Sequence, residues 1–458
     1  MIIITCISIT GIKAQSDSAL KSADKISYDL FNKAEWNSLI SFSENALKKN
    51  IDFIFLRVRL GIAYYETGKY FDAVKNLQEA FDKGYETPLL IEYLYFSYLE
   101  AGRKEDADYY FYKLPENKRK RLKPQDNSFM YEIHVDAGYG LSNDENKNEN
   151  IDLDGSFNAY GEQTLFGNYF YLNAGFKQLP LRWLNVIYSY NYLSLKKTKQ
   201  IMYNNVKTSD PYTQQQQQFY IKYDIRAGDG FVISPSGHYI YTSDNTIYSK
   251  FDSVNYSYNM QTMTYDSLNY FYTINNKPAI QDNFVLSLSL SKQMYIFKAA
   301  LHGSFSYLNG NHQSQIGANF KAYPKKKNTL YTFTDLTLQN QNDVTNLIVY
   351  QSLGGKLHKN LWGEAFVTIG KMNNYNEQNG AVVYNNPDVI NLKFGGEMKY
   401  YFNENLSASL IYVNEQREKN YLTYTLTKNG NNSPIANPEY LSLDYSVNTI
   451  LAGLKLYF

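Results

Sequence analysis

Hydrophobic and polar positions alternate one by one through the last two thirds of the chain. At the C-terminal end the apolar positions of one strand face are Phe458, Leu456, Leu454, Ala452 and Ile450. Similar alternation runs through residues 129–139, 219–226, 284–291 and 391–402. A period of two is that of a strand whose two faces meet different surroundings. We therefore expect residues 129–458 to form a β-sheet.

The lengths of the connections predict how this sheet closes. Short turns recur at residues 228–230, 324–327, 357–360 and 403–405. Long polar connections lie at about 141–150, 197–212, 244–281, 373–388 and 428–442. Short turns on one side and long loops on the other are typical of an outer-membrane β-barrel, in which one strand face meets lipid and the other the lumen. A soluble β-sandwich is the alternative fold.

Counting back from Phe458 gives the expected strands, near 405–427, 388–402, 361–372, 344–355, 328–340, 312–323, 295–308, 282–291, 231–243, 213–227, 182–197 and 168–177. Residues 129–166 hold two or three further segments, and the strict count of strands running alternately up and down fails there. A barrel with both ends in the periplasm needs an even number of strands. We predict a transmembrane antiparallel β-barrel of about 14 strands, with 12 and 16 as alternatives.

The last residues, Gly453-x-x-Leu456-x-Phe458, resemble the β-signal that the bacterial barrel-assembly machinery reads. This resemblance implies that the machinery is a partner during biogenesis. It also implies that outer-membrane lipid surrounds the apolar strand face.

Residues 17–123 have a helical period instead, with an internal repeat. Similar residues recur 34 positions apart, which is the period of the tetratricopeptide repeat: Leu39, Ala73 and Ala107; Ala46, Ala80 and Leu114; Leu30, Tyr64 and Tyr98. We predict an N-terminal α-solenoid of three tetratricopeptide repeats at about 20–53, 54–87 and 88–121, in the periplasm. Another bundle of helical hairpins is the alternative. A linker at 124–128 follows the basic run that ends at Lys123.

The first residues form a short apolar stretch with a small-residue cleavage site near Ala14-Gln15. We predict a signal peptide over 1–15, with a buried first strand as the alternative. The lone cysteine, Cys6, lies within it, which excludes cysteine-based metal or nucleophile chemistry in the mature chain.

Composition agrees with a barrel. Mean hydropathy is −0.48, because barrel strands contribute only half of their positions as apolar residues. The 46 Tyr are expected in aromatic girdles at the membrane interfaces. A net charge of +1 gives no reason to expect a nucleic acid as partner.

The five histidines show no metal-ligand spacing, and we predict neither a cofactor nor a metal. Some barrel enzymes carry a Ser/His pair at the extracellular rim. His302 and His312, with Ser304 and Ser306 near by, make a rim hydrolase a second alternative function. Polar lumen or loop histidines are the simpler interpretation.

The strand phase predicts which charged residues face the lumen: Glu132, His134, Asp136, Lys222, Asp224, Arg226, Lys298, Glu364, Lys393, Glu397 and Lys399. Opposite charges on neighbouring strands either pair and plug a narrow barrel or line a weakly selective hydrated channel. The sequence leaves both open.

The repeat domain is expected to bind a partner in a concave groove. By position the groove would be lined by Tyr28, Phe31, Phe55, Val58, Ile62, Tyr65, Phe96 and Leu99. The partner would be a periplasmic protein or a polysaccharide.

The order of export signal, helical repeats and terminal barrel resembles the YaiO-type outer-membrane proteins. The closest stretches are 345–358 and the hairpin at 391–413. The resemblance implies an outer-membrane barrel joined to periplasmic tetratricopeptide repeats. The same order is similar to that of exopolysaccharide exporters, which have longer repeat regions. Our first hypothesis is a non-enzymatic barrel whose repeat domain docks a partner for envelope assembly or secretion. The alternative is an exopolysaccharide or solute channel.

Overall fold

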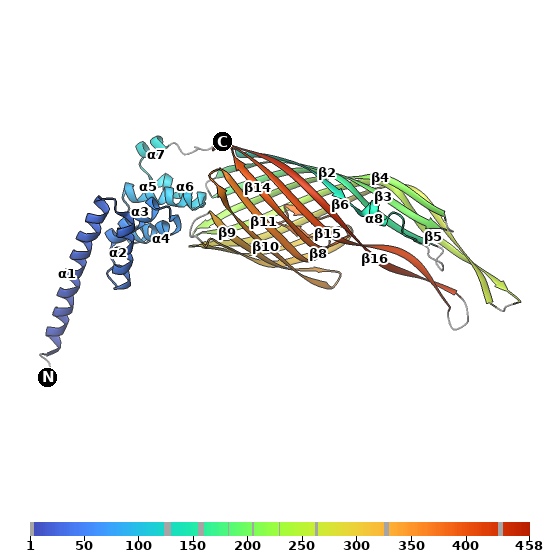
Figure 1. Cartoon of the computed structure of the whole chain (residues 1–458), viewed down its shortest axis with the longest axis horizontal. Helices are drawn as coiled ribbons and strands as arrows, with labels where there is room; N and C mark the ends of the chain where they lie inside the picture. Colours follow the sequence, from blue (N-terminus) through green and yellow to red (C-terminus); the bar gives the residue numbers. More distant parts are fainter. Residues whose placement is uncertain are drawn as a thin grey trace.

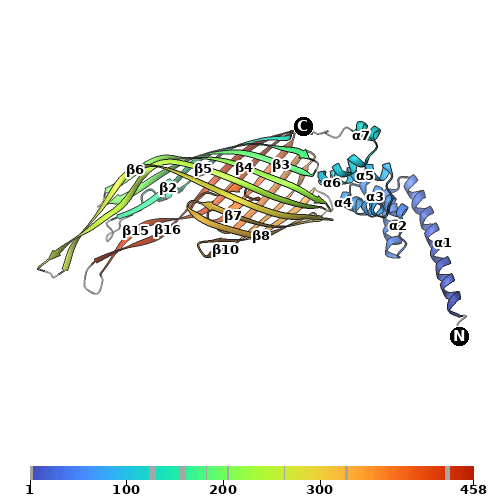
Figure 2. The same cartoon turned by 180° about the vertical axis from the view of Figure 1, so that it is seen from behind.

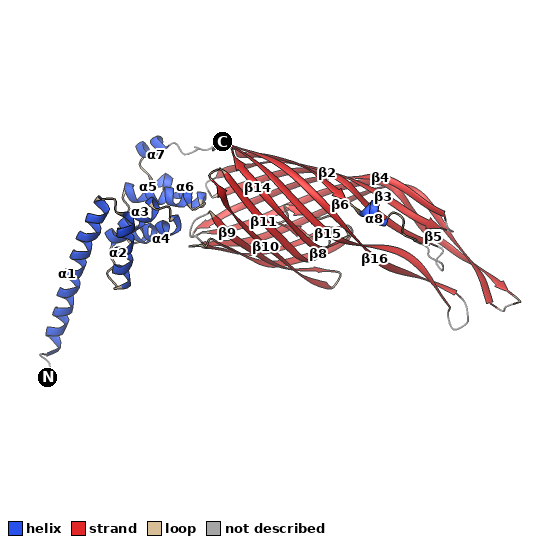
Figure 3. Cartoon of the chain, viewed as in Figure 1, coloured by secondary structure: helices blue, strands red, loops and turns tan. Residues whose placement is uncertain are grey.

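The computed structural model describes residues 4–122, 130–153, 160–181, 183–203, 206–228, 230–261, 264–324, 329–428 and 434–458. A helical region forms one end of the molecule and a β-barrel the other (Figure 1). Colouring by secondary structure shows the helices gathered at one end, except for α8 (Asp144–Asn148), which lies in the barrel (Figure 3). The predicted linker at 124–128 lies outside the described residues.

The helical region consists of consecutive helices that pack against one another. Their bounds are α1 (Ile4–Asn32), α2 (Trp36–Lys48), α3 (Ile54–Glu66), α4 (Tyr70–Asp82), α5 (Pro88–Glu100), α6 (Lys104–Lys113) and α7 (Glu116–Leu122). Helices α3 and α5 begin where the 34-residue period places a new repeat. Helix α1 begins within the predicted signal segment. No helix in the described part of the chain is long and apolar enough to cross a membrane.

A close approach between α3 and α4 explains one of the small residues in the repeat pattern. A Cβ on Gly61 would lie 2.5 Å from Cγ of Leu77, whose side chain is fully buried. The core around this contact includes Leu39, Leu60 and Leu94. Glycine is therefore needed at position 61 for the two helices to pack at this distance.

The strands close into a 14-stranded antiparallel barrel, in which β1 pairs with β16. The barrel strands are β1 (Met130–Ser142), β2 (Tyr160–Leu181), β3 (Leu184–Tyr203), β4 (Val206–Gly228), β5 (Phe231–Asn259), β6 (Thr264–Met294), β7 (Phe297–Leu308), β8 (Asn311–Ala322), β9 (Leu330–Gln341), β10 (Val344–His358), β11 (Leu361–Met372), β14 (Val389–Tyr401), β15 (Leu406–Lys428) and β16 (Pro434–Tyr457). The predicted barrel and its strand number are confirmed.

Three predicted loops are wrong. The described parts of 197–212, 244–281 and 428–442 belong largely to the long hairpins β3–β4, β5–β6 and β15–β16, which extend the end of the barrel away from the helices (Figure 2). The sequence of these segments shows no sustained alternation, but their backbones still pair. The described residues within 129–166 form β1, a short helix α8 (Asp144–Asn148) and the start of β2, so they add one strand rather than two or three further segments.

The outer wall of the barrel is apolar, as the strand phase predicts. The exposed outward-facing residues include Leu286, Leu288, Leu290, Leu301, Phe305, Ile316, Phe320, Leu336, Leu338, Phe394, Met398, Leu454, Leu456 and Phe458. Closure pairs the backbone groups of every strand, which a hydrocarbon environment requires. This wall therefore has the surface of a barrel that spans a membrane.

The barrel ends differ. The chain enters β1 and leaves β16 at the end nearest the helical region, where Phe458 N donates to Tyr131 O (3.1 Å). Short turns join the strands at this end, and we name it the short-turn end. The long hairpins and α8 belong to the opposite end. This arrangement agrees with the predicted asymmetry of the connections.

Candidate functional site: the barrel lumen

The segment between β11 and β14 folds into the barrel. It contains a small antiparallel hairpin, β12 (Asn376–Glu377) with β13 (Val382–Val383), and we name residues 373–388 the inward hairpin. Its turn is possible because Gln378, Asn379 and Gly380 adopt positive φ angles of 52°, 58° and 76°. The sequence placed these residues in a loop and gave no sign that the loop turns inward.

One wall of the barrel holds the tip of this hairpin. The carbonyl of Asn379 accepts hydrogen bonds from Tyr220 (3.3 Å) and Ser236 (2.5 Å), and the carbonyl of Gly380 lies 2.6 Å from His238 Nδ1. The side chain of Asn379 donates to Ser289 Oγ (3.1 Å). The tip is therefore bound to β4, β5 and β6.

The base of the hairpin is bound to other strands. The amides of Gln313 and Gln339 donate to the carbonyl of Asn373 at 3.1 and 2.6 Å. On β14, Lys393 is only 3% exposed and its Nζ lies 2.5 Å from Glu377 of the hairpin. Contacts with β4, β5, β6, β8, β9 and β14 place the hairpin across the lumen.

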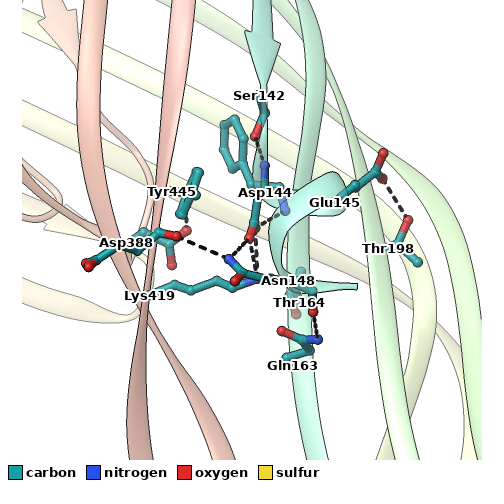
Figure 4. Close-up of polar contacts among 12 residues, drawn as sticks. Ser142, Asp144, Glu145, Asn148, Gln163, Thr164, Thr198, Asp388, Lys419 and Tyr445 are labelled. Atoms are coloured by element: carbon teal, nitrogen blue, oxygen red, sulfur yellow. Dashed lines mark hydrogen bonds and ion pairs between the residues drawn. The ribbon is translucent and has the colours of Figure 1, made fainter. Parts of the chain in front are cut away.

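A second inward segment is α8, which occupies the lumen nearer the end opposite the short-turn end. Asp144 is fully buried, lies 2.8 Å from Lys419 Nζ and accepts a hydrogen bond from Phe166 N (2.7 Å) (Figure 4). Asn148 donates to Asp444 O (3.3 Å). A buried pair of this kind is costly to break, because the remaining charge would be left without a partner.

Tyr445 links this cluster to the inward hairpin. Its hydroxyl donates to Asp388 Oδ2 (2.5 Å), at the end of the hairpin, and the Lys419 ammonium lies 5.9 Å from its ring centroid (Figure 4). The two inward segments are thus joined to each other as well as to the wall.

A polar cavity of about 510 Å³ lies between the inward hairpin and the short-turn end. The hairpin contributes Glu377, Gln378 and Asn379 to its lining. The wall contributes charged side chains from β4, β7, β8, β9 and β11, among them Lys222, Arg226, Lys298, Lys321, Asp335 and Glu364. Its volume is in the range of cavities that hold small-molecule ligands, about 300–1,000 Å³.

The structure places the predicted lumen charges on the inner wall, where many have a partner. Glu132 (6% exposed) pairs with Lys177 at 2.9 Å, and Lys222 pairs with Asp224 at 3.1 Å. The other predicted residues follow the same strand phase: His134, Asp136, Arg226, Lys298, Glu364, Lys393, Glu397 and Lys399. Lys177, Lys321, Asp335 and Glu377 are further charged residues of the lumen that the strand phase did not predict.

The structure does not bring the two rim histidines together. His302 faces the cavity, and its Nε2 lies 3.0 Å from Asp335. His312 is exposed on the opposite face of the sheet, stacked beside Phe305 (ring centroids 5.7 Å apart). Since side chains at these positions point to opposite sides of the wall, the two histidines do not form one site. No cluster of His, Cys, Asp and Glu side chains within the described ranges could hold a metal ion.

The predicted groove residues separate into three groups. Val58 and Ile62 are 7% and 1% exposed, so they belong to the core and their assignment to a groove surface was wrong. Phe31, Tyr65 and Phe96 are partly buried against the core. Tyr28, Phe55 and Leu99 are exposed, and the guanidinium of Arg59 lies over the rings of Tyr28 and Phe55.

The helical region contacts the short-turn end through α4. Phe71 packs on Tyr323, with ring centroids 5.2 Å apart, and Asp72 accepts a hydrogen bond from Tyr295. Lys75 lies 5.6 Å from the ring centroid of the same tyrosine. These two tyrosines stand in the β6–β7 turn and at the end of β8, so α4 sits against the rim below the cavity.

Two residues of the predicted assembly signal, Gly453 and Leu456, lie on β16, and Phe458 directly follows it. Leu456 and Phe458 are exposed on the outer wall, at 40% and 42%. Gly453 faces inward, where a Cβ would lie 2.1 Å from the Asp136 carboxylate. Their recognition by the assembly machinery stays a prediction.

Solved structures of other barrels resemble this chain only distantly. They include a Pseudomonas aeruginosa FadL homologue (7% identity, TM-score 0.43, covering 72% of this chain and 90% of that one). The Pseudomonas putida toluene transporter TodX is similar (9%, 0.42, 74% and 92%), as is the Acinetobacter baumannii outer membrane protein Omp33 (8%, 0.31, 72% and 99%). No family model matches the chain. No curated protein matches it. The resemblance to YaiO-type proteins therefore stays a prediction.

Proposed function

We propose that this protein is a non-enzymatic outer-membrane channel for small polar solutes, closed by its inward hairpin. The observation that carries the proposal is the position of that hairpin, across the lumen and above a cavity of about 510 Å³ lined by charged and hydroxyl side chains. In the same proposal, residues 1–15 are a signal peptide, and the tetratricopeptide repeats of 17–123 and the linker at 124–128 lie in the periplasm.

The way in which the hairpin is held favours a gate over a permanent plug. Most of its contacts are hydrogen bonds between neutral groups, such as those of Ser236, Gln313 and Gln339. Each contributes about 1 kcal/mol net, because water replaces the partner when the hairpin leaves. Two contacts described above are exceptions: the ion pair between Lys393 and Glu377, and the hydrogen bond from Tyr445 to the carboxylate of Asp388. A segment bound in this way can exchange between two positions.

The side chains that line the cavity also favour a polar solute over a hydrocarbon. TodX is named as a toluene transporter, whereas the cavity here is lined by lysines, carboxylates and serines. Hydrocarbon gains little from such a surface, because the polar groups would lose water without finding a partner.

Planar-bilayer conductance tests the channel directly. Replacing residues 374–387 by a short Gly-Ser linker should raise the conductance several-fold. In a C6S background, the pair S289C and N379C should lock the hairpin on oxidation, since the Asn379 side chain lies 3.1 Å from Ser289 Oγ. Conductance should then fall and return on reduction, while the single-cysteine variants stay unaffected. If the shortened protein carries no current, the barrel is not a channel.

A second candidate is the docking of a periplasmic protein or polysaccharide by the helical region. The exposed Tyr28 and Phe55 flank Arg59, while α4 is occupied by the barrel rim. A photocrosslinking residue at position 55, tested in native envelopes, should give a single adduct that Y28A weakens. If adducts are as abundant with Tyr28 replaced, the docking idea fails.

A further inference from the structure

Six inward-facing serines lie side by side on three neighbouring strands at the cavity. The pairing register places Ser236 opposite Ser287 and Ser234 opposite Ser289 between β5 and β6, and Ser287 opposite Ser304 between β6 and β7. We name Ser234, Ser236, Ser287, Ser289, Ser291 and Ser304 the serine patch, and all but Ser236 line the cavity. Hydroxyls both donate and accept hydrogen bonds, and their small size leaves room for a ligand.

Two lysines stand directly opposite each other beside this patch. Lys298 on β7 pairs in register with Lys321 on β8, and both line the cavity. Like charges at directly opposed positions are unfavourable. Among the ion pairs of the described residues, none joins either ammonium group to a carboxylate within 4.0 Å. Lys321 lies instead 3.7 Å from the ring centroid of Tyr331.

The carboxylates that line the same cavity are already engaged. Asp224 is paired with Lys222 (3.1 Å) and accepts from Ser234 (2.6 Å), and Glu377 is paired with Lys393. Asp335 lies 3.0 Å from His302 and accepts from Thr337 (2.7 Å) and Asn319 (3.2 Å). Glu364 accepts from the hydroxyls of Tyr331 and Tyr350. Within the described residues, neither ammonium group of the lysine pair therefore has a carboxylate in direct contact, and Glu364, held by neutral hydroxyls, acts on Lys321 only from a distance.

We propose that the solute of this channel is a small hydroxylated anion. Its carboxylate or phosphate would bind between Lys298 and Lys321, and its hydroxyls would exchange hydrogen bonds with the serine patch. The transport of this anion rests on the proposed channel function, but its binding between the two lysines does not depend on conduction. An anion at this position removes the repulsion between the two lysines, and the cavity has the volume for a monosaccharide-sized molecule.

Isothermal titration of the full-length protein in detergent tests the site, with gluconate as the hydroxylated anion. Glucose, glucosamine and acetate are matched probes that lack the negative charge, reverse it or lack the hydroxyls. We expect gluconate to bind at least tenfold more tightly than each of the three. The double variant K298Q/K321Q should lose at least tenfold in gluconate affinity. In the control, K292Q, affinity should not change, because Lys292 stands at an outward-facing position of the neighbouring strand β6, over Phe231.

The hydroxyl contacts have their own variant. S287A/S289A should lower the affinity for gluconate several-fold and leave the weak affinity for acetate unchanged. Equal affinity for gluconate and glucose, or a K298Q/K321Q protein that binds gluconate as the native one does, would overturn the proposal. If the protein conducts but does not bind gluconate, the channel proposal stands and the anion-site proposal fails. If it binds gluconate through these lysines but never conducts, the anion-site proposal stands and the channel proposal fails.

Discussion

The two regions of this molecule place their apolar residues on opposite sides. In the helical region Leu77 is fully buried in a core of packed helices. In the barrel Leu288 is 56% exposed on the outer wall, while Lys393 is 3% exposed inside. A leucine is therefore buried in one region of the chain and exposed in the other. The surroundings of the element decide which side its apolar residues occupy: apolar side chains are buried where the outside is water and exposed where the outside is hydrocarbon.

Because their apolar residues lie on opposite sides, the two regions are stabilised in different ways. The helices are held together by apolar burial between them, so their stability depends on close packing. The barrel is held by its closed ladder of backbone hydrogen bonds, and its interior needs only polar groups that find partners. Mutations of the same kind should therefore have very different effects in the two regions.

The largest effect is expected from a cavity in the helical core. Leu77→Ala should cost the helical region about 2–5 kcal/mol of unfolding free energy, because it removes a fully buried side chain next to Gly61. With Trp183 and Trp362 replaced by Phe, Trp36 reports this region alone, and urea unfolding followed by its fluorescence gives the value. Leu99→Ala, at an exposed position (38%), is the control and should cost much less.

On the barrel the same truncation should matter little, whereas a charge should not be tolerated. Leu288 lies six residues before the end of β6 at the short-turn end, close to the expected middle of the bilayer. Leu288→Arg should cost about 2–4 kcal/mol, and Leu288→Ala clearly less. Unfolding of the refolded protein in lipid vesicles measures both. Equal costs for the two variants would mean that this wall does not meet hydrocarbon.

The barrel wall could be predicted from the sequence, whereas the segments inside it could not. Strand number and strand faces follow from alternation, because every membrane-spanning strand must repeat it. The inward hairpin and α8 have no such period, and their contacts join residues far apart in the chain, as between His238 and Gly380. These contacts depend on the barrel being closed, so no local pattern marks them.

One missed feature had a local signal. Asn309-Gly310 forms the turn between β7 and β8, with φ angles of 49° and 78°. Asn-Gly is the typical pair of a two-residue hairpin turn, and such a turn fixes the register of its strands. Counting outward from it pairs Lys298 with Lys321, as the structure does. The lysine pair was therefore accessible from the sequence, while the cavity around it was not.

A smaller effect is expected where the helices approach each other. Gly61→Ala should destabilise the helical region by about 1–3 kcal/mol, because its Cβ would lie 2.5 Å from Leu77 Cγ and the packed neighbours must move. Gly84→Ala is the matched control for steric crowding, since no atom lies within 4 Å of its Cβ position, although its φ of 89° adds backbone strain. The double variant G61A/L77A should be less destabilised than the sum of the single ones, because the smaller side chain gives the new methyl group room.

The smallest effect is expected at the surface of the helical region and depends on pH. Hydrogen bonding to Arg57 (2.9 Å), together with Lys83 (3.1 Å), lowers the pKa of Asp52 below its ordinary value of 3.8. A carboxyl group with a lowered pKa in the folded state stabilises that state above its ordinary pKa, and the contribution is lost as the pH falls through the folded pKa. Asp52→Asn should therefore cost about 0.2–1 kcal/mol at neutral pH, the range of partly exposed ion pairs. The cost should disappear below the folded pKa, where the native carboxyl is also neutral. Urea unfolding followed through Trp36 at several pH values measures this difference, and a cost that stays constant down to acidic pH would show that the charge of Asp52 contributes nothing.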